Sequence, residues 1–335
     1  MAKYSFILPV HNGGSYIKEC VASILSQTLK DFNLIILENK SNDGTYEWLQ
    51  ALNDSRIQLY PAEMLLPIRD NWARITAIPK NEFITLTGHD DLFDRDYLAV
   101  MDKLINKNPG ASLFCTQFRY IDAGGNTIRQ CKPIHLKESL PEFLRSILMY
   151  NSDIMGTGFL MRAADYNRIG GMPLYPNFLF ADFELWLQLT MLGYKIAAVE
   201  TCFSFRQHQS STSKSADAKF LNDFGILIDY FKRLKTTDSD CESIIDSCGA
   251  NFLLCYCKSL SHRLLRSKLK DRGNIKVKNV IQKFQEFALV LGLGSQFKPY
   301  TKPFILSGLF VDSNIITRWL FLHFKKIFPR VVFSK

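Results

Sequence analysis

One almost uninterrupted apolar stretch, FNLIILE (residues 32–38), constrains the fold of this chain most strongly. Such a run is typical of a strand that is buried on both faces, as in a parallel sheet covered by helices. Further strand-like segments occur at YSFILPV, RIQLYPA and FITLT, and segments with helical spacing separate them. This alternation predicts an α/β fold with a mostly parallel central sheet and right-handed crossovers.

The two ends of the chain differ in pattern and in charge. Residues 111–205 mix strand-like and helix-like segments, and beyond residue 214 the strand signals fade and helical spacing takes over. Residues 214–335 hold 21 Lys and Arg against 10 Asp and Glu, whereas the rest of the chain is close to neutral. We therefore expect an α/β domain over residues 1–213 and a mainly helical, basic C-terminal region over residues 214–335, suited to an anionic surface.

Polar residues follow three of the expected strands. Asn12, Asn39 and Asp90 each come directly after a strand-like segment, and ligands of parallel sheets bind at the carboxyl ends of strands. The stretch FITLTGHDDLFD also places Asp91 next to Asp90, so two adjacent acids end one strand. A bound cation would relieve their repulsion, while Asp91 and Asp94 can alternatively start the next helix, where acids suit the helix dipole.

The first 45 residues carry several ordered motifs. FILPVHNGGSYIKECVASILSQTLKDFNLIILENKSNDGT resembles the opening of glycosyltransferase family 2, with a strand ending in Pro-x-x-Asn, a Ser-x-Leu-x-Gln-Thr segment, and an acidic loop after the second strand. The resemblance runs through residues 4–213. It implies a GT-A fold and the transfer of a sugar from a nucleotide diphosphate sugar, with a UDP-sugar favoured, to an acceptor hydroxyl with inversion.

The same resemblance suggests how a donor is bound. Glu38 and Asn39 stand where the family carries an Asp-Asp pair, whose second member usually hydrogen-bonds the nucleobase. An Asn both donates and accepts, so a base-binding role stays possible for Asn39. The resemblance also implies a nucleoside pocket, contacted mostly through backbone, that is lined by Pro9, Val10, His11 and Asn12.

The metal site is implied by the four residues Gly88, His89, Asp90 and Asp91, which align with a DxD-type motif. Gly88 replaces the usual first acid, whereas Asp90 matches the acid that binds Mn²⁺ or Mg²⁺ with the donor diphosphate. His89 and Asp91 are the donor-binding neighbours. Hard divalent cations take oxygen ligands from one or two carboxylates and from phosphates.

Other donor contacts are implied by residues further along the chain. Arg74 lies in a segment similar to the family's Asn-x-x-x-Ala-Arg and would reach the donor, with an ordinary surface helix Arg as the alternative. The segment FRQHQSSTS resembles the family's Tyr-Arg-x-His-x-x-Ser. It implies a metal ligand at His208 and a diphosphate contact at Arg206.

The residue expected to do the chemistry is Asp182. Family members carry Glu-Asp-x-(Asp/Glu)-Leu here, and Asp182 matches the general base, while Ala181 replaces the first acid. A positioned carboxylate can take the proton of the attacking hydroxyl. The alternative for Asp182 is a helix N-cap, and Glu184 is expected to be structural. The altered positions 88 and 181 leave open a catalytically inactive nucleotide-sugar-binding protein.

The C-terminal segment NIITRWLFLHFKKIFPRVVF mixes aromatic and aliphatic residues with Lys and Arg. Such a pattern suits either a helix lying in a membrane interface or an amphipathic helix packed on the protein. In the first case the acceptor would be a saccharide or a lipid-linked saccharide of a surface polysaccharide pathway. Eight cysteines without a regular framework favour the cytoplasm, and a membrane helix would place the chain peripherally on the inner face of the cell membrane. No nucleic-acid-binding module is recognisable, so no nucleic-acid partner is expected.

Overall fold

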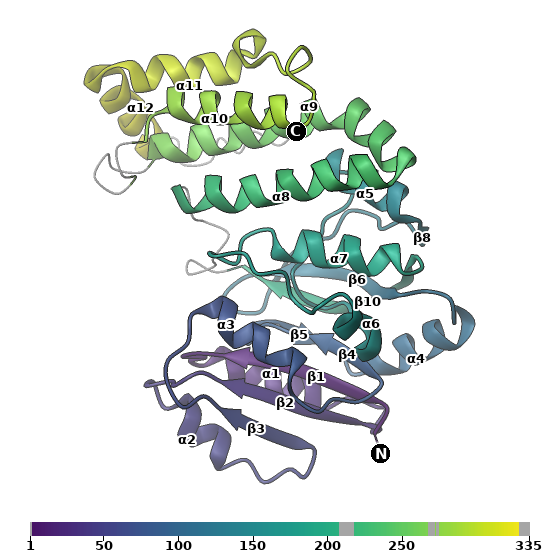
Figure 1. Ribbon diagram of the computed structural model, residues 1–335. Helices are drawn as coiled ribbons and strands as arrows, with labels where there is room; N and C mark the ends of the chain where they lie inside the picture. The colour runs from purple at the N-terminus through teal and green to yellow at the C-terminus, as the bar shows by residue number, and fades with distance from the viewer. Residues whose placement is uncertain (1, 208–217, 267–271, 273–274, 328–335) are drawn as a thin grey trace. The chain divides into compact units, whose positions relative to one another are not determined.

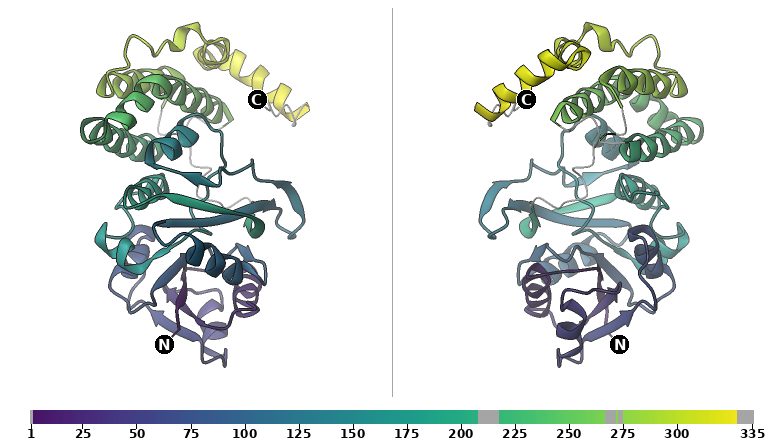
Figure 2. Two further views of the ribbon diagram at one scale, coloured as in Figure 1. Left: turned by 90° about the vertical axis from the view of Figure 1, so that its right-hand side faces the viewer. Right: turned by 90° about the vertical axis from the view of Figure 1, so that its left-hand side faces the viewer.

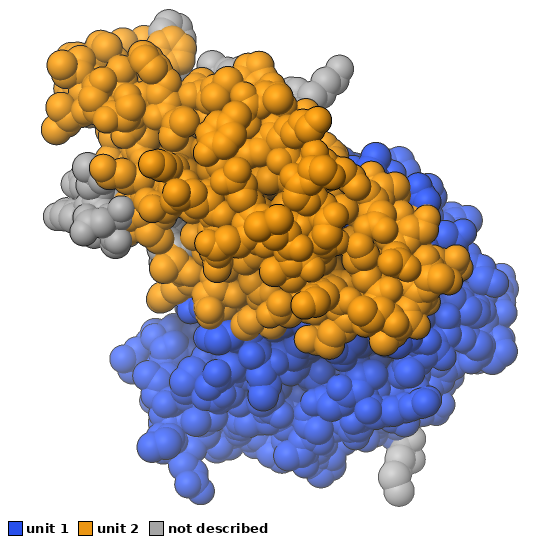
Figure 3. Space-filling view, turned by 45° about the horizontal axis from the view of Figure 1, so that its top comes forward, with its two compact units in different colours: residues 1–211 blue, residues 212–335 orange. Residues whose placement is uncertain are grey.

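The computed structural model of the protein describes residues 2–207, 218–266, 272 and 275–327. The chain divides into two compact units, residues 1–211 and residues 212–335, which Figure 3 shows in different colours. The first unit combines a sheet with helices, and the described part of the second contains helices and short turns (Figure 1). The predicted α/β class with a helical C-terminal region is confirmed.

Four parallel strands form the first half of the sheet, in the order β3-β2-β1-β4. Val10 pairs with Glu38 across β1 and β2, and Ile7 pairs with Leu86 across β1 and β4, so the strands end at one edge. Their side chains are almost entirely buried in β1, β2 and β4, as the apolar runs predict. The strands are β1 (Tyr4–Val10), β2 (Phe32–Glu38), β3 (Ile57–Pro61) and β4 (Phe83–Leu86).

The second half of the sheet is mixed. A three-residue strand, β9 (Leu160–Arg162), lies antiparallel between β4 and β6 (Leu113–Ile121), and β10 (Lys195–Arg206) runs parallel to β6. Three short strands pair antiparallel with β6 or β10. These are β5 (Leu92–Phe93), β7 (Thr127–Gln130) and β8 (Lys137–Glu138).

Helices of the first unit bury one apolar face each. The first helix buries Ile17, Cys20, Val21 and Ile24, which recur at helical spacing. A capping box between Ser139 and Glu142 starts α5. The helices are α1 (Tyr16–Leu25), α2 (Thr45–Gln50), α3 (Ile68–Ala73), α4 (Tyr97–Lys107), α5 (Leu140–Leu148), α6 (Ala163–Arg168) and α7 (Ala181–Met191), with a 3₁₀ turn at Arg74–Thr76.

The second unit is built around one long helix, α9, which packs against α8, α10 and α11. Aromatic rings fill this core, where Phe224 contacts Phe252, Phe284 and Phe287. Figure 2 shows the last two helices, in yellow-green and yellow, turning sharply at their junction. The helices are α8 (Ala218–Thr237), α9 (Ser239–Arg266), α10 (Val277–Val290), α11 (Pro303–Ser313) and α12 (Ile315–Ile327), with a 3₁₀ turn at Pro299–Thr301.

Candidate active site

The loops that follow β1 and β2 are joined by hydrogen bonds. Asn12 adopts a left-handed backbone (φ 53°), donates its N–H to Ser41 Oγ at 2.9 Å, and accepts the N–H of Asn42 at 2.9 Å. Gly14 donates to the Asp43 carboxylate, also at 2.9 Å. The loops after two strands that end about 28 residues apart in sequence are therefore linked into one surface.

Both the nitrogen and the oxygen of the Asn39 side-chain amide form hydrogen bonds to backbone. Its Nδ2 donates to Leu66 O and its Oδ1 accepts from Leu66 N, both at 2.9 Å, and the residue is only 3% exposed. The Asn39 carbonyl accepts from His11 Nδ1 at 2.8 Å, which requires a proton on Nδ1. The side chain of Asn39 therefore holds the loop after β3 in place, and exposed His11 keeps its other ring nitrogen available.

Two further predicted donor residues have backbone partners. The buried Glu38 carboxylate accepts the N–H groups of Lys40 and Ser41, at 3.2 and 2.6 Å, and so shapes the loop after β2. The Arg74 guanidinium donates to Glu38 O at 3.2 Å and to Tyr60 O at 2.7 Å, and burial lowers its pKa. Arg74 thereby ties the ends of β2 and β3 to the helix before it.

The two adjacent acids after β4 lie over Gly88. A Cβ atom on Gly88 would come within 2.8 Å of Asp90 Oδ1 and 3.1 Å of Asp91 Oδ2. Asp91 is fully buried and accepts from Thr157 Oγ1 at 2.6 Å and from the Arg206 N–H at 3.2 Å. Burial and the neighbouring Asp90 charge raise the pKa of Asp91 to about 8. The place of the family's first acid is therefore filled by two carboxylate oxygens.

Asp182 lies close to these acids through a short segment before β9. Its Oδ2 is 3.2 Å from where a Cβ of Gly156 would lie, and the next residue is Thr157, the hydroxyl partner of Asp91. Trp186 fixes this segment by donating its indole N–H to Met155 O at 3.0 Å. The predicted base and the predicted metal-binding loop consequently share one neighbourhood.

Asp182 is buried at the start of α7, after two residues with an unusual backbone conformation. Phe178 and Phe180, just before α7, both have left-handed φ values, of 60° and 64°, which bulky residues rarely adopt. Burial raises the pKa of Asp182 to about 6, although backbone N–H groups at the start of α7 hold it down in part. The carboxylate is thus charged at neutral pH yet more basic than an exposed Asp.

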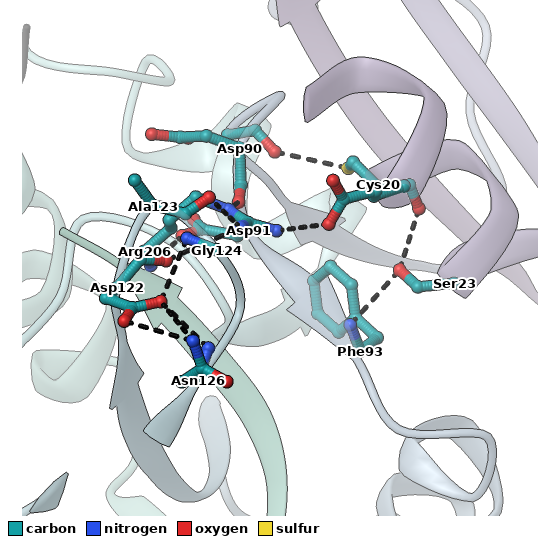
Figure 4. A network of polar contacts seen from close by, with 12 residues as sticks. Cys20, Ser23, Asp90, Asp91, Phe93, Asp122, Ala123, Gly124, Asn126 and Arg206 are labelled. Carbon is teal, nitrogen blue, oxygen red and sulfur yellow. Dashed lines mark hydrogen bonds and ion pairs between the residues drawn. The ribbon is translucent and has the colours of Figure 1, made fainter. Parts of the chain in front are cut away.

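Arg206, the last residue of β10, is fully buried and is bound by several acceptors (Figure 4). It donates to Asp90 O at 2.8 Å, to Ala123 O at 3.1 Å and to the Glu19 carboxylate at 2.6 Å, and its guanidinium lies 4.6 Å from the centroid of the Tyr16 ring. Arg206 therefore holds the loop that carries Asp90 and Asp91 against α1 and the β6–β7 turn.

The remaining predicted residues lie in β1, in the acidic loop, in α7 and outside the described part of the chain. Pro9 and Val10 are buried in β1, where they pair with β2, and His89 is half-buried in the acidic loop. Glu184 accepts from Tyr175 and Gln188 inside the unit, in keeping with the expected structural role. His208 lies outside the described residues.

Residues close to Asp90 fit a divalent cation. Asp90 Oδ1 and Asp91 Oδ2 both lie beside Gly88, within 2.8 and 3.1 Å of where its Cβ would be, and hard cations are bound by one or two carboxylates together with phosphates and water. Among the described residues there is no group of three or more His, Cys, Asp or Glu that forms a complete metal site. A cation here would therefore depend on oxygen atoms of a bound diphosphate.

The pattern of the sequence does not reveal Thr157 and Gly156. Both lie in a Gly-rich segment before β9, and only the fold brings them between Asp91 and Asp182. The two glycines around Thr157, between the acidic segments at 90–91 and 182–184, are the one sequence signal that the backbone is closely approached there.

Residues 5–170 match the family described as Glycosyl transferase family 2. This part of the chain belongs to glycosyltransferase family 2. Among curated relatives, an uncharacterized glycosyltransferase of Rickettsia typhi, RT0329, is 25% identical over 63% of this chain, and the match spans 66% of its own length, just under two thirds. The O-antigen biosynthesis glycosyltransferase WbnJ of Escherichia coli is 26% identical over 76% of this chain and 96% of its own.

Solved structures share the fold at low sequence identity. Residues 1–349 of S. aureus TarS, in complex with UDP-GlcNAc, superpose with a TM-score of 0.70 at 13% identity, over 98% of this chain and 93% of that one. The mannosyltransferase PcManGT of Pyrobaculum calidifontis, with GDP-Man and Mn²⁺, superposes with a TM-score of 0.54 at 14% identity, over 92% and 86%. The predicted GT-A fold of this family-2 domain is confirmed.

Proposed function

We propose that the protein is an inverting, metal-dependent glycosyltransferase that moves one sugar from a nucleotide diphosphate sugar to an acceptor hydroxyl. The observation that carries the proposal is the short path from Asp91 through Thr157 and Gly156 to Asp182. It brings an anionic strand end, suited to a cation and a diphosphate, next to a carboxylate whose pKa is raised toward neutrality.

The chain supplies three functions for such a reaction. The loops after β1 and β2, with His11 and Asn12, seat the nucleoside. Asp90 and Asp91 would hold Mn²⁺ or Mg²⁺, and the cation, when bound, would neutralise charge on the departing diphosphate. Asn39, Arg74 and Arg206 are buried or half-buried and bound to backbone, so we assign them to positioning these loops rather than to direct donor contact.

Asp182 acts as the general base. It takes the proton of the acceptor hydroxyl as that oxygen forms a bond to the anomeric carbon, while the bond from this carbon to the diphosphate oxygen breaks and the nucleoside diphosphate leaves. A single displacement of this kind inverts the anomeric configuration. Phe159 and Trp186, whose ring centroids lie 4.5 Å apart, pack on the segment that carries Gly156 and Thr157 and would help to exclude water from it.

Substrates are inferred from chemistry and from relatives. A UDP-sugar is favoured as the donor, because TarS was solved with UDP-GlcNAc. PcManGT was solved with GDP-Man, so the test of the nucleobase includes GDP-sugars. The acceptor is a saccharide or lipid-linked saccharide in surface polysaccharide or glycolipid biosynthesis, as the relative WbnJ suggests. The eight free cysteines agree with work in the cytoplasm.

A panel of nucleotide sugars tests the proposal. The protein is incubated with each UDP- or GDP-sugar, with and without Mn²⁺ or Mg²⁺, and released nucleoside diphosphate is measured. We expect hydrolysis of one donor class, loss of it on chelation with EDTA, and a drop of about 10²-fold or more in Asp182→Asn. Asp153→Asn, at a carboxylate bound to Arg129 and to the backbone of Lys132, serves as the matched control.

Titration calorimetry with the same donors separates the alternative. Binding of a nucleotide sugar without turnover by the wild-type chain, with donor and acceptor panels both present, would favour an inactive sugar-nucleotide-binding protein. That alternative rests on Gly88 and Ala181, which replace two acids that the family usually carries. Turnover that is unchanged in Asp182→Asn would instead refute the assignment of the base.

A further inference from the structure

The outer face of α12 is apolar, which reverses the usual arrangement of a surface helix. Ile315, Ile316 and Trp319 are 80%, 67% and 61% exposed, whereas Arg318 is 8% exposed. Soluble proteins normally turn the apolar stripe of a helix inward and its charges outward. We define the α12 face as the exposed side chains Ile315, Ile316, Trp319, Leu320, Phe324 and Ile327.

The neighbouring helix extends this apolar surface. Phe310, near the end of α11, is 66% exposed, and Phe304 and Leu306 are also exposed. Thr317 of α12 donates its hydroxyl to Val311 O of α11 at 2.9 Å, so the exposed end of α11 lies beside the start of α12. Large apolar patches on a surface mark interaction sites. Trp319 stacks on His323 with ring centroids 5.4 Å apart, so an amphipathic pair of rings lies on the same surface.

Charge identifies what can cover the patch. From residue 287 to the C-terminus the sequence has seven Lys and Arg and a single acid, Asp312. Asp312 is itself paired with the buried Arg272 at 3.2 Å and accepts the N–H of Val277 at 2.8 Å. An apolar surface whose own segment is basic, with its one acid engaged in this way, attracts an anionic partner.

A second copy of the chain fits this surface poorly. A two-fold contact would bring the same apolar patch of both copies together, and with it the basic segment that surrounds it in each copy. Like charges brought together at an apolar contact are unfavourable. An anionic bilayer, by contrast, offers acyl chains to the aromatic and aliphatic side chains and lipid phosphates to the lysines.

The length of the helices favours a shallow position. No described helix is by itself long and apolar enough to cross a bilayer; α11 and α12 together have the length and composition, but they are bent by 116°. Thirteen residues make a helix of about 20 Å, which is shorter than the roughly 30 Å hydrocarbon core. We propose that α11 and α12 dock the second unit on an anionic membrane surface, with the α12 face in the headgroup–acyl boundary.

Vesicle binding tests the proposal independently of catalysis. The full chain is mixed with phosphatidylcholine vesicles that contain either no anionic lipid or about a third phosphatidylglycerol, and bound protein is measured by flotation. We expect binding to the anionic vesicles only, weakened by salt. The variant I316Q/W319Q/L320Q should bind about ten-fold more weakly or worse, and Leu289→Gln, on an equally exposed apolar residue of α10, should bind like wild type.

Two further measurements keep the proposal falsifiable. A blue shift of tryptophan emission on anionic vesicles, absent in Trp319→Phe, would place the α12 face in the bilayer, and quenching by brominated lipids at shallow depth agrees with an interfacial helix. Quenching at the bilayer centre would overturn the interfacial position. Equal vesicle binding by the triple variant, or none by the wild type, refutes docking; a dimer in light scattering that the triple variant loses would assign the face to self-association.

Discussion

Replacing Asn39 by Asp should destabilise the protein, although Asp is the residue that the family usually carries here. In the wild type, the Asn39 amide donates to Leu66 O and accepts from Leu66 N, both at 2.9 Å, in a site that is 3% exposed. A carboxylate keeps the second bond and loses the first, and it brings a second acceptor against the Leu66 carbonyl. A buried carbonyl without its donor costs about 1–3 kcal/mol.

The expected change is measurable by thermal unfolding of the full chain. A loss of about 2 kcal/mol corresponds to a decrease in Tm of about 4–8 °C for a unit of this size. The Michaelis constant for the donor should also rise, because the loop after β3 loses its anchor. Asn42→Asp is the matched control, since it adds the same charge three residues away at an exposed position.

The pH dependence gives the prediction its sign. In the Asn39→Asp variant, burial and the facing carbonyl raise the folded-state pKa of the introduced carboxyl above its unfolded value. Only the protonated form donates to Leu66 O, so the variant is closest to wild type at low pH and loses stability as the pH rises through the raised pKa. A variant Tm within about 1 °C of wild type at pH 7.5, or a gap that stays constant down to pH 5, refutes the reasoning.

The other predictions concern the path from the acidic loop to the base. The raised pKa of Asp182 predicts that kcat/KM falls about ten-fold per unit below a pH of about 6 and is flat above it; a flat profile down to pH 5 would contradict the assignment. Gly88→Asp should lower activity rather than restore a motif, because it adds a third carboxylate where Asp90 Oδ1 and Asp91 Oδ2 already lie 2.8 and 3.1 Å from its Cβ, and a gain over Gly88→Ala in donor hydrolysis would contradict this reasoning. Thr157→Val removes the 2.6 Å bond to Asp91 and should lower kcat several-fold with little change in donor Kd, whereas Thr157→Ser should retain activity; equal kcat in both variants would show that the bond does not matter.

Sequence patterns predicted the first half of the sheet well. β1 and β2 coincide with apolar runs, because strands buried on both faces need apolar side chains at nearly every position and the runs are too short for typical helices. The two-residue β5 and the three-residue β9 were missed, since a period of two cannot be seen in so few residues. The long helix α9 was not singled out either, because its polar residues are spread around its surface.

Site residues were easier to locate than to interpret. Strand ends placed Asn12, Asn39 and Asp90 at one edge, because parallel strands end on the same side of a sheet. The sequence did not indicate that the side chains of Asn39 and Arg206 are bound to backbone, since their partners, Leu66 O and Ala123 O, lie in loops without a pattern. Such partners depend on tertiary structure alone.

The anchoring of Arg206 has a consequence for biosynthesis of the chain. The N–H of this residue completes the surroundings of an acid 115 positions earlier, and its side chain reaches a carboxylate 187 positions earlier. Contacts so distant in sequence form late, after the ribosome has released most of the polypeptide. A nascent chain stalled before residue 206 would therefore carry an unfinished acidic loop, so that nucleotide-sugar affinity should emerge only when the last strand of the sheet is in place.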